Sequence, residues 1–441
     1  RTRCPTRGPT QCAGSPSACA ASSTRKESSL DRELVADCVH CGFCLPTCPT
    51  YSLWGEEMDS PRGRIYLMEA RLDGTVELNR TVVQHFDACL GCMACVTSCP
   101  SGVQYDKLIE LTRERVEEEF DRSPRERLLR AAVFRTLPYP RRMKAALALA
   151  PIGKRLPGPL RPLATLAPPW RSSEEPPEFC DAIGERRGRV ALLTGCVASV
   201  LFGDVNTATA RVLRAEGFEV VAPHGQSCCG ALSVHGGRRD EGKVFARRTI
   251  EAFESTRADF FVTNAAGCGS NLKEYGFLLA DDPEWAERAE RLAVRVRDIS
   301  EVLAELEPRA KRKPLPLRVA FQDSCHLLHA QGISQEPRAM LGAIPELVVT
   351  ELPEQEICCG SAGIYNVVMP DAAAELGARK AAHVVEAAPD AYASANPGCL
   401  VQVTTQLRKL GRPTPAFHPI ELVDASIRGV SVARLLTRAR Q

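Results

Sequence analysis

The chain has few aromatic residues, almost no excess of either charge and no long apolar run. Phe, Trp and Tyr make up 5% of its 441 residues, and the formal net charge is +2 at pH 7. A dedicated nucleic-acid-binding protein normally carries a strong basic excess, so no nucleic-acid partner is expected. No run of about eighteen apolar residues occurs, so the sequence predicts no membrane-spanning helix.

Motifs for substrate chemistry are also missing. No G-x-G-x-x-G follows a predicted strand, so we do not expect the chain to bind FAD through a dinucleotide fold. We identify no catalytic triad, and no pair of carboxylates at helical spacing that would suit hydroxy-acid chemistry. Residues 1–29 lack the apolar core of a secretory signal and are rich in Arg, Ser, Thr, Pro and Cys. We expect a disordered tail there, with Cys4, Cys12 and Cys19 as tail residues rather than ligands.

Cysteine, by contrast, is abundant, with 20 residues. Eight of them form two runs that each read C-x2-C-x2-C-x3-C-P, the spacing by which bacterial-type ferredoxins hold iron–sulfur cubanes. Three thiolates two residues apart can hold one face of a cluster, and the fourth reaches the other cluster. The spacing therefore predicts two [4Fe-4S] clusters, one held by Cys38, Cys41, Cys44 and Cys99, and one by Cys89, Cys92, Cys95 and Cys48.

Two other uses of these cysteines were weighed. Zinc accepts four thiolates, but its usual spacing is two C-x2-C pairs with a longer gap between them. Disulfides need an oxidising compartment and are typical of small secreted chains. Reduced cysteines in this number instead indicate a cytoplasmic location.

The first folded unit is expected at residues 30–122, as a mostly helical two-cluster ferredoxin. Ser60 and Pro61 have the residue types that begin a helix, and Gly74 suits its end. Arg62 and Arg64 could lie near a cluster, dock a partner or mark an exposed helix start. Residues 123–187 follow as a basic, proline-rich linker with helices. Such a segment can be solvated, lie on an anionic membrane surface or dock on an acidic partner.

From residue 188 onward, strands alternate with helices, which predicts parallel sheets with helical cover. The pattern occurs twice, at residues 188–307 and 315–430. Cys325 lies 129 residues after Cys196, Cys358 lies 130 after Cys228, and Cys399 lies 131 after Cys268. This near-constant step indicates an internal duplication. Each half also contains a C-C-G sequence, so we expect two duplicated α/β cysteine-rich (CCG) domains behind the ferredoxin domain.

Every cysteine of the duplication follows a predicted strand. Ligands of open α/β sheets bind beyond the carboxyl ends of the strands, so four thiols should converge at one rim in each half. These thiols are candidates for a further iron–sulfur cluster, although one or two could be buried core thiols. They are Cys196, Cys228, Cys229 and Cys268 in the first half and Cys325, Cys358, Cys359 and Cys399 in the second. His326 follows Cys325 and could be a ligand or proton donor, but a structural role is favoured.

Eight segments carry a family resemblance, among them the sequences around both cysteine runs and both C-C-G motifs. The chain is similar to iron–sulfur subunits of glycolate oxidase (glycolate dehydrogenase) and, more broadly, to proteins that join a ferredoxin to paired CCG domains. Where the wider group has a terminal C-x2-C pair, this chain has Ala265 and Asn396 at the first position, as the glycolate oxidase branch does. The segments are 39–44, 48–51, 60–67, 97–103, 228–231, 267–269, 273–276 and 358–363.

The resemblance implies an electron-transfer subunit. It would take electrons from FAD-containing dehydrogenase subunits that oxidise glycolate to glyoxylate and pass them toward a quinone-type acceptor. The chain would lie in the cytoplasm, either free or as a peripheral protein on the cytoplasmic face of the inner membrane. Alternatives are a heterodisulfide-reductase-like, lactate-utilisation or glycerol-3-phosphate dehydrogenase subunit that reduces a disulfide or quinone at the CCG site, and a zinc-stabilised interaction module.

Overall fold

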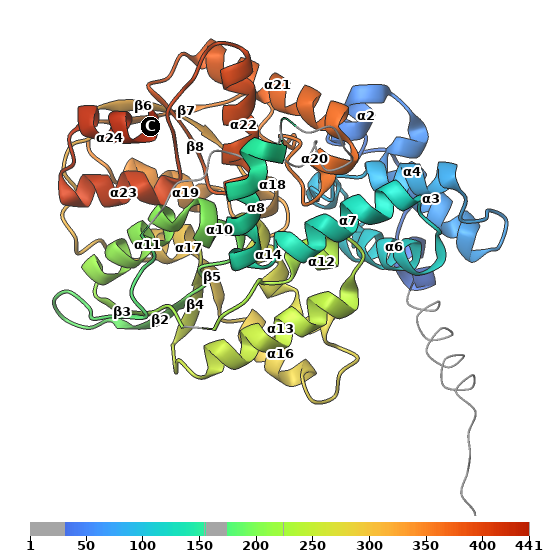
Figure 1. The fold of residues 1–441 in the computed structure, drawn as a ribbon, viewed down its shortest axis with the longest axis horizontal. Coiled ribbons are helices and arrows are strands. Elements are labelled where there is room, and N and C mark those ends of the chain that lie inside the picture. Colours follow the sequence, from blue (N-terminus) through green and yellow to red (C-terminus); the bar gives the residue numbers. More distant parts are fainter. Residues whose placement is uncertain (1–30, 154, 156–173, 224, 441) are drawn as a thin grey trace, which may run out of the picture.

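The computed structural model describes residues 31–153, 155, 174–223 and 225–440. Figure 1 shows three parts: a small helical unit in blue and cyan, and two larger α/β halves in green to yellow and in orange to red. The tail expected at residues 1–29 lies outside the described residues. Among the described residues, no helix is both long and apolar enough to cross a bilayer.

The helical unit contains the two cysteine runs. Its elements are α2 (Pro49–Trp54), the 3-10 helix η1 (Glu57–Asp59), α3 (Pro61–Leu72), α4 (Arg80–Ala88), α5 (Ala94–Thr97) and α6 (Tyr105–Glu119). No strand occurs between residues 31 and 122. The Ser60 hydroxyl accepts a hydrogen bond from the Gly63 amide and caps α3, with Pro61 in its first turn. A mostly helical ferredoxin domain is thus confirmed.

Two helices follow, α7 (Pro124–Thr136) and α8 (Pro140–Gly153). The helices expected in this basic segment are present, but they are packed rather than solvated. Phe134 of α7 is buried, and Met143 and Leu147 of α8 pack against Val200 of the first α/β half. Residues 154 and 156–173, which carry many of the prolines of the expected linker, lie outside the described residues.

The first half has a five-stranded sheet in the order β1-β3-β2-β4-β5. Its strands are β1 (Phe179–Cys180), β2 (Gly188–Leu192), β3 (Phe218–Val221), β4 (Phe260–Thr263) and β5 (Val296–Asp298), all parallel except β1. Since β1 pairs with β3, the sheet begins before residue 188, the boundary expected from the sequence. The helices are α10 (Val197–Leu201), α11 (Gly203–Ala215), α12 (Ala231–His235), α13 (Arg239–Glu254), α14 (Ala266–Lys273), α15 (Tyr275–Leu278), α16 (Ala286–Ala293) and α17 (Ile299–Glu305).

The second half repeats this arrangement with four parallel strands in the order β7-β6-β8-β9. They are β6 (Leu317–Gln322), β7 (Leu347–Glu351), β8 (Ala391–Ser394) and β9 (Ala416–Phe417). Each half therefore places its first parallel strand, β2 or β6, between the next two, which confirms the duplicated α/β fold. The helices are α18 (Cys325–Leu328), α19 (Gln335–Gly342), α20 (Tyr365–Val368), α21 (Pro370–Ala387), α22 (Pro397–Lys409), α23 (Pro419–Arg428) and α24 (Val432–Arg440).

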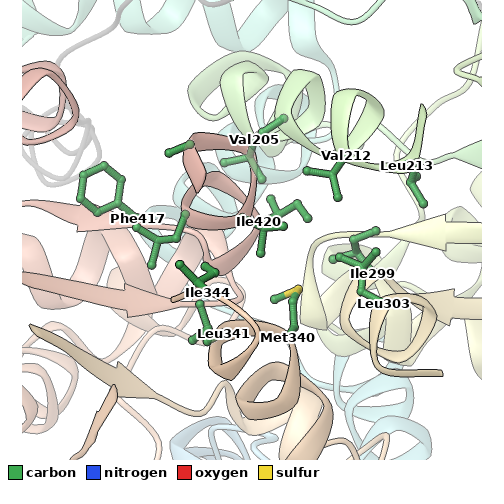
Figure 2. Packing of buried hydrophobic residues seen from close by; sticks show 14 of the residues in the cluster. Val205, Val212, Leu213, Ile299, Leu303, Met340, Leu341, Ile344, Phe417 and Ile420 are labelled. Carbon is green, nitrogen blue, oxygen red and sulfur yellow. The ribbon is translucent and has the colours of Figure 1, made fainter. Parts of the chain in front are cut away.

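One hydrophobic core joins the two halves. Figure 2 shows Val205 and Val212 of α11, in the first half, facing Ile420 of α23 in the second. Ile299 and Leu303 of α17 belong to the same cluster, as do Met340 and Leu341 of α19. Apolar faces of both sheets also contribute, so these four helices form a shared layer between the sheets. This packing fixes the cysteine-rich rims of the two halves relative to each other.

Candidate functional site

Four thiols from the two cysteine runs surround one buried cavity in the helical unit. Cys48 of the first run and Cys89, Cys92 and Cys95 of the second line a cavity with about 300 Å³ of empty space, part of it open to solvent. This is the set that the crossed ligand pattern assigns to one cluster. Cys48 precedes α2 and Cys89 follows α4, so the ends of two helices bring the runs together.

The loop between Cys89 and Cys95 turns sharply. Gly91 has a φ of +65°, a conformation that costs residues with a Cβ energy, and Met93 also has a positive φ of +64°. The Gly91 amide donates a hydrogen bond to the Cys89 sulfur over 3.3 Å. The turn thus points successive thiols into one cavity and supplies a backbone donor to sulfur, a contact that tunes iron–sulfur clusters.

Arg64 is a buried cation beside this cavity. Its side chain is only 1% exposed, and its Nε donates to the carbonyl of His85 over 2.6 Å. Burial would raise the pKa of the Cys89 thiol, but the guanidinium groups of Arg64 and Arg113 outweigh this effect and lower that pKa. Arg64 is therefore not part of an exposed helix start, one of the roles considered from the sequence.

The other four thiols lie closer to the surface. Cys41 is exposed, and Cys38, Cys44 and Cys99 are partly buried. Burial raises the pKa of Cys38, and the nearby Cys99 and Cys41 raise it further, which places these three thiols close together. Arg62 donates to the His40 carbonyl over 3.3 Å and pairs with Glu57. One thiol set therefore lies near solvent and the other lies inside.

The spacing of the thiols distinguishes a cluster from a single ion. Among the described residues, no group of three or more His, Cys, Asp or Glu side chains is close enough to hold one metal ion. Four sulfurs bound to one zinc ion would each lie about 2.3 Å from it. In a cubane each sulfur binds a different iron, so the thiols stand farther apart around a cavity. The 17 described cysteines also form no disulfide. The donor set therefore fits a [4Fe-4S] cluster.

In the second half, Cys325, Cys358, Cys359 and Cys399 gather at the rim of the sheet. The sulfurs of Cys325 and Cys358 are 3.8 Å apart, and the Asn396 side chain donates to the Cys399 sulfur over 3.6 Å. Cys358 also shares a hydrophobic cluster with Cys92 of the helical unit. Burial raises the pKa of Cys92 well above its ordinary value, and Cys358 adds to this effect. The rim of the second half therefore adjoins the buried thiol cavity.

The first half gathers its own four thiols. The sulfurs of Cys196 and Cys228 are 3.3 Å apart. Hydrogen bonds from Cys228 and Cys268 lower the pKa of Cys229 well below its ordinary value. The Tyr275 hydroxyl donates to the Cys229 carbonyl over 2.6 Å and fixes the loop. All eight cysteines predicted to converge thus lie at strand ends, four in each half.

Three side chains near the thiols had no role in the sequence prediction. Tyr105 donates its hydroxyl to the Cys89 sulfur over 3.7 Å, and Arg113 donates to the Cys89 carbonyl. Lys380 is 1% exposed, and burial lowers its pKa although Cys359 and Cys358 act to raise it. Lys380 interrupts an apolar stripe on α21 at helical spacing, and that pattern is a signal of a buried cation.

His326 links the second half to the buried thiol cavity. Its Nε2–H donates to the Gly91 carbonyl over 3.0 Å, and Nδ1 accepts from the Ser270 hydroxyl over 2.8 Å. Burial lowers the pKa of His326 to about 3, so the ring is neutral at physiological pH. His329, on the same segment, lies 2.8 Å from the Thr97 hydroxyl. These contacts give His326 the structural role favoured from the sequence.

Comparison with known proteins agrees with this architecture. Residues 34–103 match the family described as 4Fe-4S dicluster domain, and residues 190–273 and 319–404 each match the cysteine-rich domain named CCG. A solved structure of a hypothetical protein from Helicobacter pylori shares the fold, with a TM-score of 0.52 and 10% identity over 85% of this chain and 69% of that one.

Two relatives match nearly the whole chain. The probable glycolate oxidase iron-sulfur subunit of Bacillus subtilis is 37% identical, over 93% of this chain and 95% of its own length. The glycolate oxidase iron-sulfur subunit of Escherichia coli is 36% identical, over 88% of this chain and 93% of its own length. The chain therefore belongs to the family of glycolate oxidase iron–sulfur subunits, in which a two-cluster ferredoxin domain precedes two CCG domains.

Proposed function

We propose that this chain is the electron-transfer subunit of a flavin-dependent 2-hydroxy-acid dehydrogenase that converts glycolate to glyoxylate. Its partners would be FAD-containing subunits, which oxidise the substrate, and its electrons would pass toward a quinone-type acceptor. The observation that carries the proposal is the single cavity lined by Cys48, Cys89, Cys92 and Cys95, because it joins both cysteine runs around one buried space.

The proposed cofactors are two [4Fe-4S] clusters, which supply single-electron transfer when bound. Cys38, Cys41, Cys44 and Cys99 would hold the outer cluster, near solvent. Cys48, Cys89, Cys92 and Cys95 would hold the inner one. The outer position suits docking of a partner, and the inner position suits transfer within the chain.

The residues around the inner site would raise its reduction potential. Arg64 and Arg113 place positive charge near Cys89, and Tyr105 and the Gly91 amide donate hydrogen bonds to its sulfur. Each of these groups favours extra negative charge on the site and so raises its reduction potential. An inner site of higher potential than the outer one would draw electrons inward.

The thiols of the CCG halves are the proposed location of any further iron–sulfur cluster. Cys358 lies beside Cys92, so electrons at the inner site would reach the second half first. We propose a cytoplasmic location for the chain, with peripheral contact to the inner membrane if the acceptor is a membrane quinone.

Anaerobic isolation of the tagged chain from its own host tests this function. The expected result is a brown complex that contains flavin, with about eight iron atoms in the ferredoxin domain, whose colour bleaches when glycolate is added. A complex that bleaches with lactate or glycerol 3-phosphate but not with glycolate would contradict the substrate assignment.

A variant pair tests the ligands. Cys95→Ser should lower the iron content by the equivalent of about one cluster. Cys180→Ser is the matched control, because Cys180 is buried in the core shared by the two halves rather than at a thiol cavity. It should retain full iron. Equal iron in both variants would contradict the assignment of the inner set.

A further inference from the structure

A second cavity lies against the inner thiol site. It encloses about 590 Å³ of empty space, part of it open to solvent, where the helical unit, α7 and both CCG halves meet. Cys89 and Leu90 line this cavity and also the thiol cavity. The two spaces are therefore separated by a wall that these two residues share. We name the second cavity the junction cavity.

Three buried polar atoms at the junction cavity have no hydrogen-bond partner. They are the Tyr365 hydroxyl, the His235 Nε2 and the Arg130 Nε, from α20, α12 and α7 respectively. Tyr365 is 4% exposed, so bulk water does not readily supply a hydrogen-bond partner for its hydroxyl. A buried polar group without a partner costs about 1–3 kcal/mol. Two of the three, the Tyr365 hydroxyl and the Arg130 Nε–H, are donors, so a ligand with acceptor oxygens would complete their hydrogen bonds.

The three arginines of the wall are already engaged by neighbouring groups, which favours a neutral ligand over an anion. Arg122 pairs with Asp87 over 2.7 Å, and Arg130 pairs with Glu117 over 2.8 Å. The third arginine, Arg113, donates to the carbonyls of Cys89 and His235. His235 Nδ1 lies 2.8 Å from a carboxylate oxygen of Glu110. Asp87 is the one carboxylate of the lining, but Arg122 and Arg130 are ion-paired and Arg113 is bound to two carbonyls, so each arginine already has a partner.

The rest of the lining is apolar. Leu90, Leu232, Ile364 and Val368 contribute hydrocarbon surface between the polar atoms. A flat apolar ring with oxygen acceptors at opposite edges would bury its faces against these side chains. Its oxygens would accept hydrogen bonds from the Tyr365 hydroxyl and from the Arg130 Nε–H. A quinone head group has this chemistry.

We propose that the junction cavity binds the head group of a quinone, next to the inner cluster site. The identity of the electron source rests on the proposed function above. A bound quinone becomes a quinol by taking up two electrons, supplied singly across the wall formed by Cys89 and Leu90, and two protons, one at each ring oxygen. The electrons derive from oxidation of the 2-hydroxy acid, and the protons come from solvent.

Equilibrium dialysis of the anaerobically purified full chain against duroquinone tests this binding. Duroquinone is neutral and fully substituted, so it does not add to thiols. The unaltered chain should bind one equivalent. Tyr365→Phe should bind about fivefold to tenfold more weakly, the loss expected for one hydrogen bond. Leu232→Trp should abolish binding, because the indole would occupy the cavity. Tyr66→Phe is the control, since Tyr66 is exposed on α3 and lies outside the cavity lining; it should leave the affinity unchanged.

Iron content and visible absorption are measured on every variant to show that the fold and clusters are intact. No binding by an iron-loaded chain, or equal affinity of Tyr365→Phe and the unaltered chain, would overturn the quinone proposal and leave electron transfer standing. Failure to hold iron would instead overturn the proposed function, while the dialysis would still report on the cavity.

Discussion

At the scale of single residues, a buried charge should set the reduction potential of the inner site, and a buried helix cap should make stability depend on pH. Arg64 is fully enclosed yet lies beside Cys89, where its positive charge lowers the pKa of the thiol. Such a cation should act on a bound cluster as it acts on the thiol, by favouring added negative charge.

Arg64→Gln should lower the reduction potential of the inner cluster. Loss of a nearby unit charge in a partly shielded interior corresponds to a shift on the order of 50–100 mV. Potentiometric titration followed by electron paramagnetic resonance would measure it. Arg71→Gln on the same helix is the control, because Arg71 pairs with Glu119 instead. An unchanged potential in Arg64→Gln would show that its charge does not reach the cluster.

His418 should make stability depend on pH. It caps α23, where its Nδ1 accepts from the Ile420 amide over 3.2 Å, and burial lowers its pKa to about 4. The folded state therefore favours the neutral ring, and its contribution to stability is lost as pH falls from about 6.5 toward 4.

His418→Asn keeps a good capping residue without a titrating group. The melting temperature of the unaltered chain should fall more between pH 7 and pH 5 than that of the variant, by the equivalent of about 2 kcal/mol. Anaerobic calorimetry at the two pH values would measure this difference. Parallel curves for the two proteins would mean that His418 titrates alike in the folded and unfolded states.

At the scale of elements, α7 is the helix whose packing was least evident from the sequence. Its Phe134 is 1% exposed and receives the guanidinium groups of Arg130 and Arg238 over its ring at 5.7 and 4.8 Å. A Cβ added at Gly236 would come within 2.4 Å of the same ring. The ring therefore fills a site formed by α7 and the loop after α12.

Phe134→Ala should lower the free energy of unfolding by about 3–5 kcal/mol, the cost of emptying a buried aromatic site. Leu128→Ala on the same helix is the control, because Leu128 is exposed and its loss should cost less than about 0.5 kcal/mol. Thermal unfolding followed by circular dichroism would compare the two. If both variants melted together, α7 would be no more than a solvated connection.

The parallel strands that lead to the CCG thiols were predictable, whereas the short strands β1, β5 and β9 and many of the short helices were not. The strands that precede Cys196, Cys268 and Cys399 followed from apolar runs, and the helix at α3 followed from Ser60 and Pro61. The packing of α7 and α8 was not predictable, because Phe134, Met143 and Leu147 pack on residues of the first half that are distant in the sequence. The two-residue strand β1 is also too short to produce a periodic signal.

The candidate site also has features that were predictable from the sequence and features that were not. The convergence of the CCG thiols followed from strand topology, since the carboxyl ends of parallel strands meet at one rim. The buried position of Arg64, the contact of Cys92 with Cys358 and the junction cavity could not be derived. Each depends on how separate units dock, and no spacing within one segment encodes that.

At the scale of the whole molecule, the two CCG halves behave as one body. Arg211 of α11 pairs with Asp424 of α23 over 2.7 Å, beside the apolar layer that the halves share. Neither half alone would cover the helices shown in Figure 2, so their stabilities should be coupled.

Ile420→Ala in the second half should therefore destabilise the first half by about 2–5 kcal/mol. Trp285, buried in the first half, can report this if Trp54 and Trp170 are replaced by Phe. The midpoint of its fluorescence change in urea should fall. Val348→Ala, at an exposed position of β7, is the control and should leave the midpoint in place. A midpoint unaffected by Ile420→Ala would mean that the halves unfold independently.

The proximity of Cys92 and Cys358 makes the two duplicated halves unequal. The two halves are copies of one unit, but only Cys358 shares a hydrophobic cluster with Cys92 of the helical unit, whereas its counterpart Cys228 clusters with Cys196 and Phe245 of its own surroundings. Under the proposed function, substitutions at these corresponding positions should therefore differ: loss of Cys358 would disturb electron transfer next to the inner site, whereas loss of Cys228 would disturb a site farther from it.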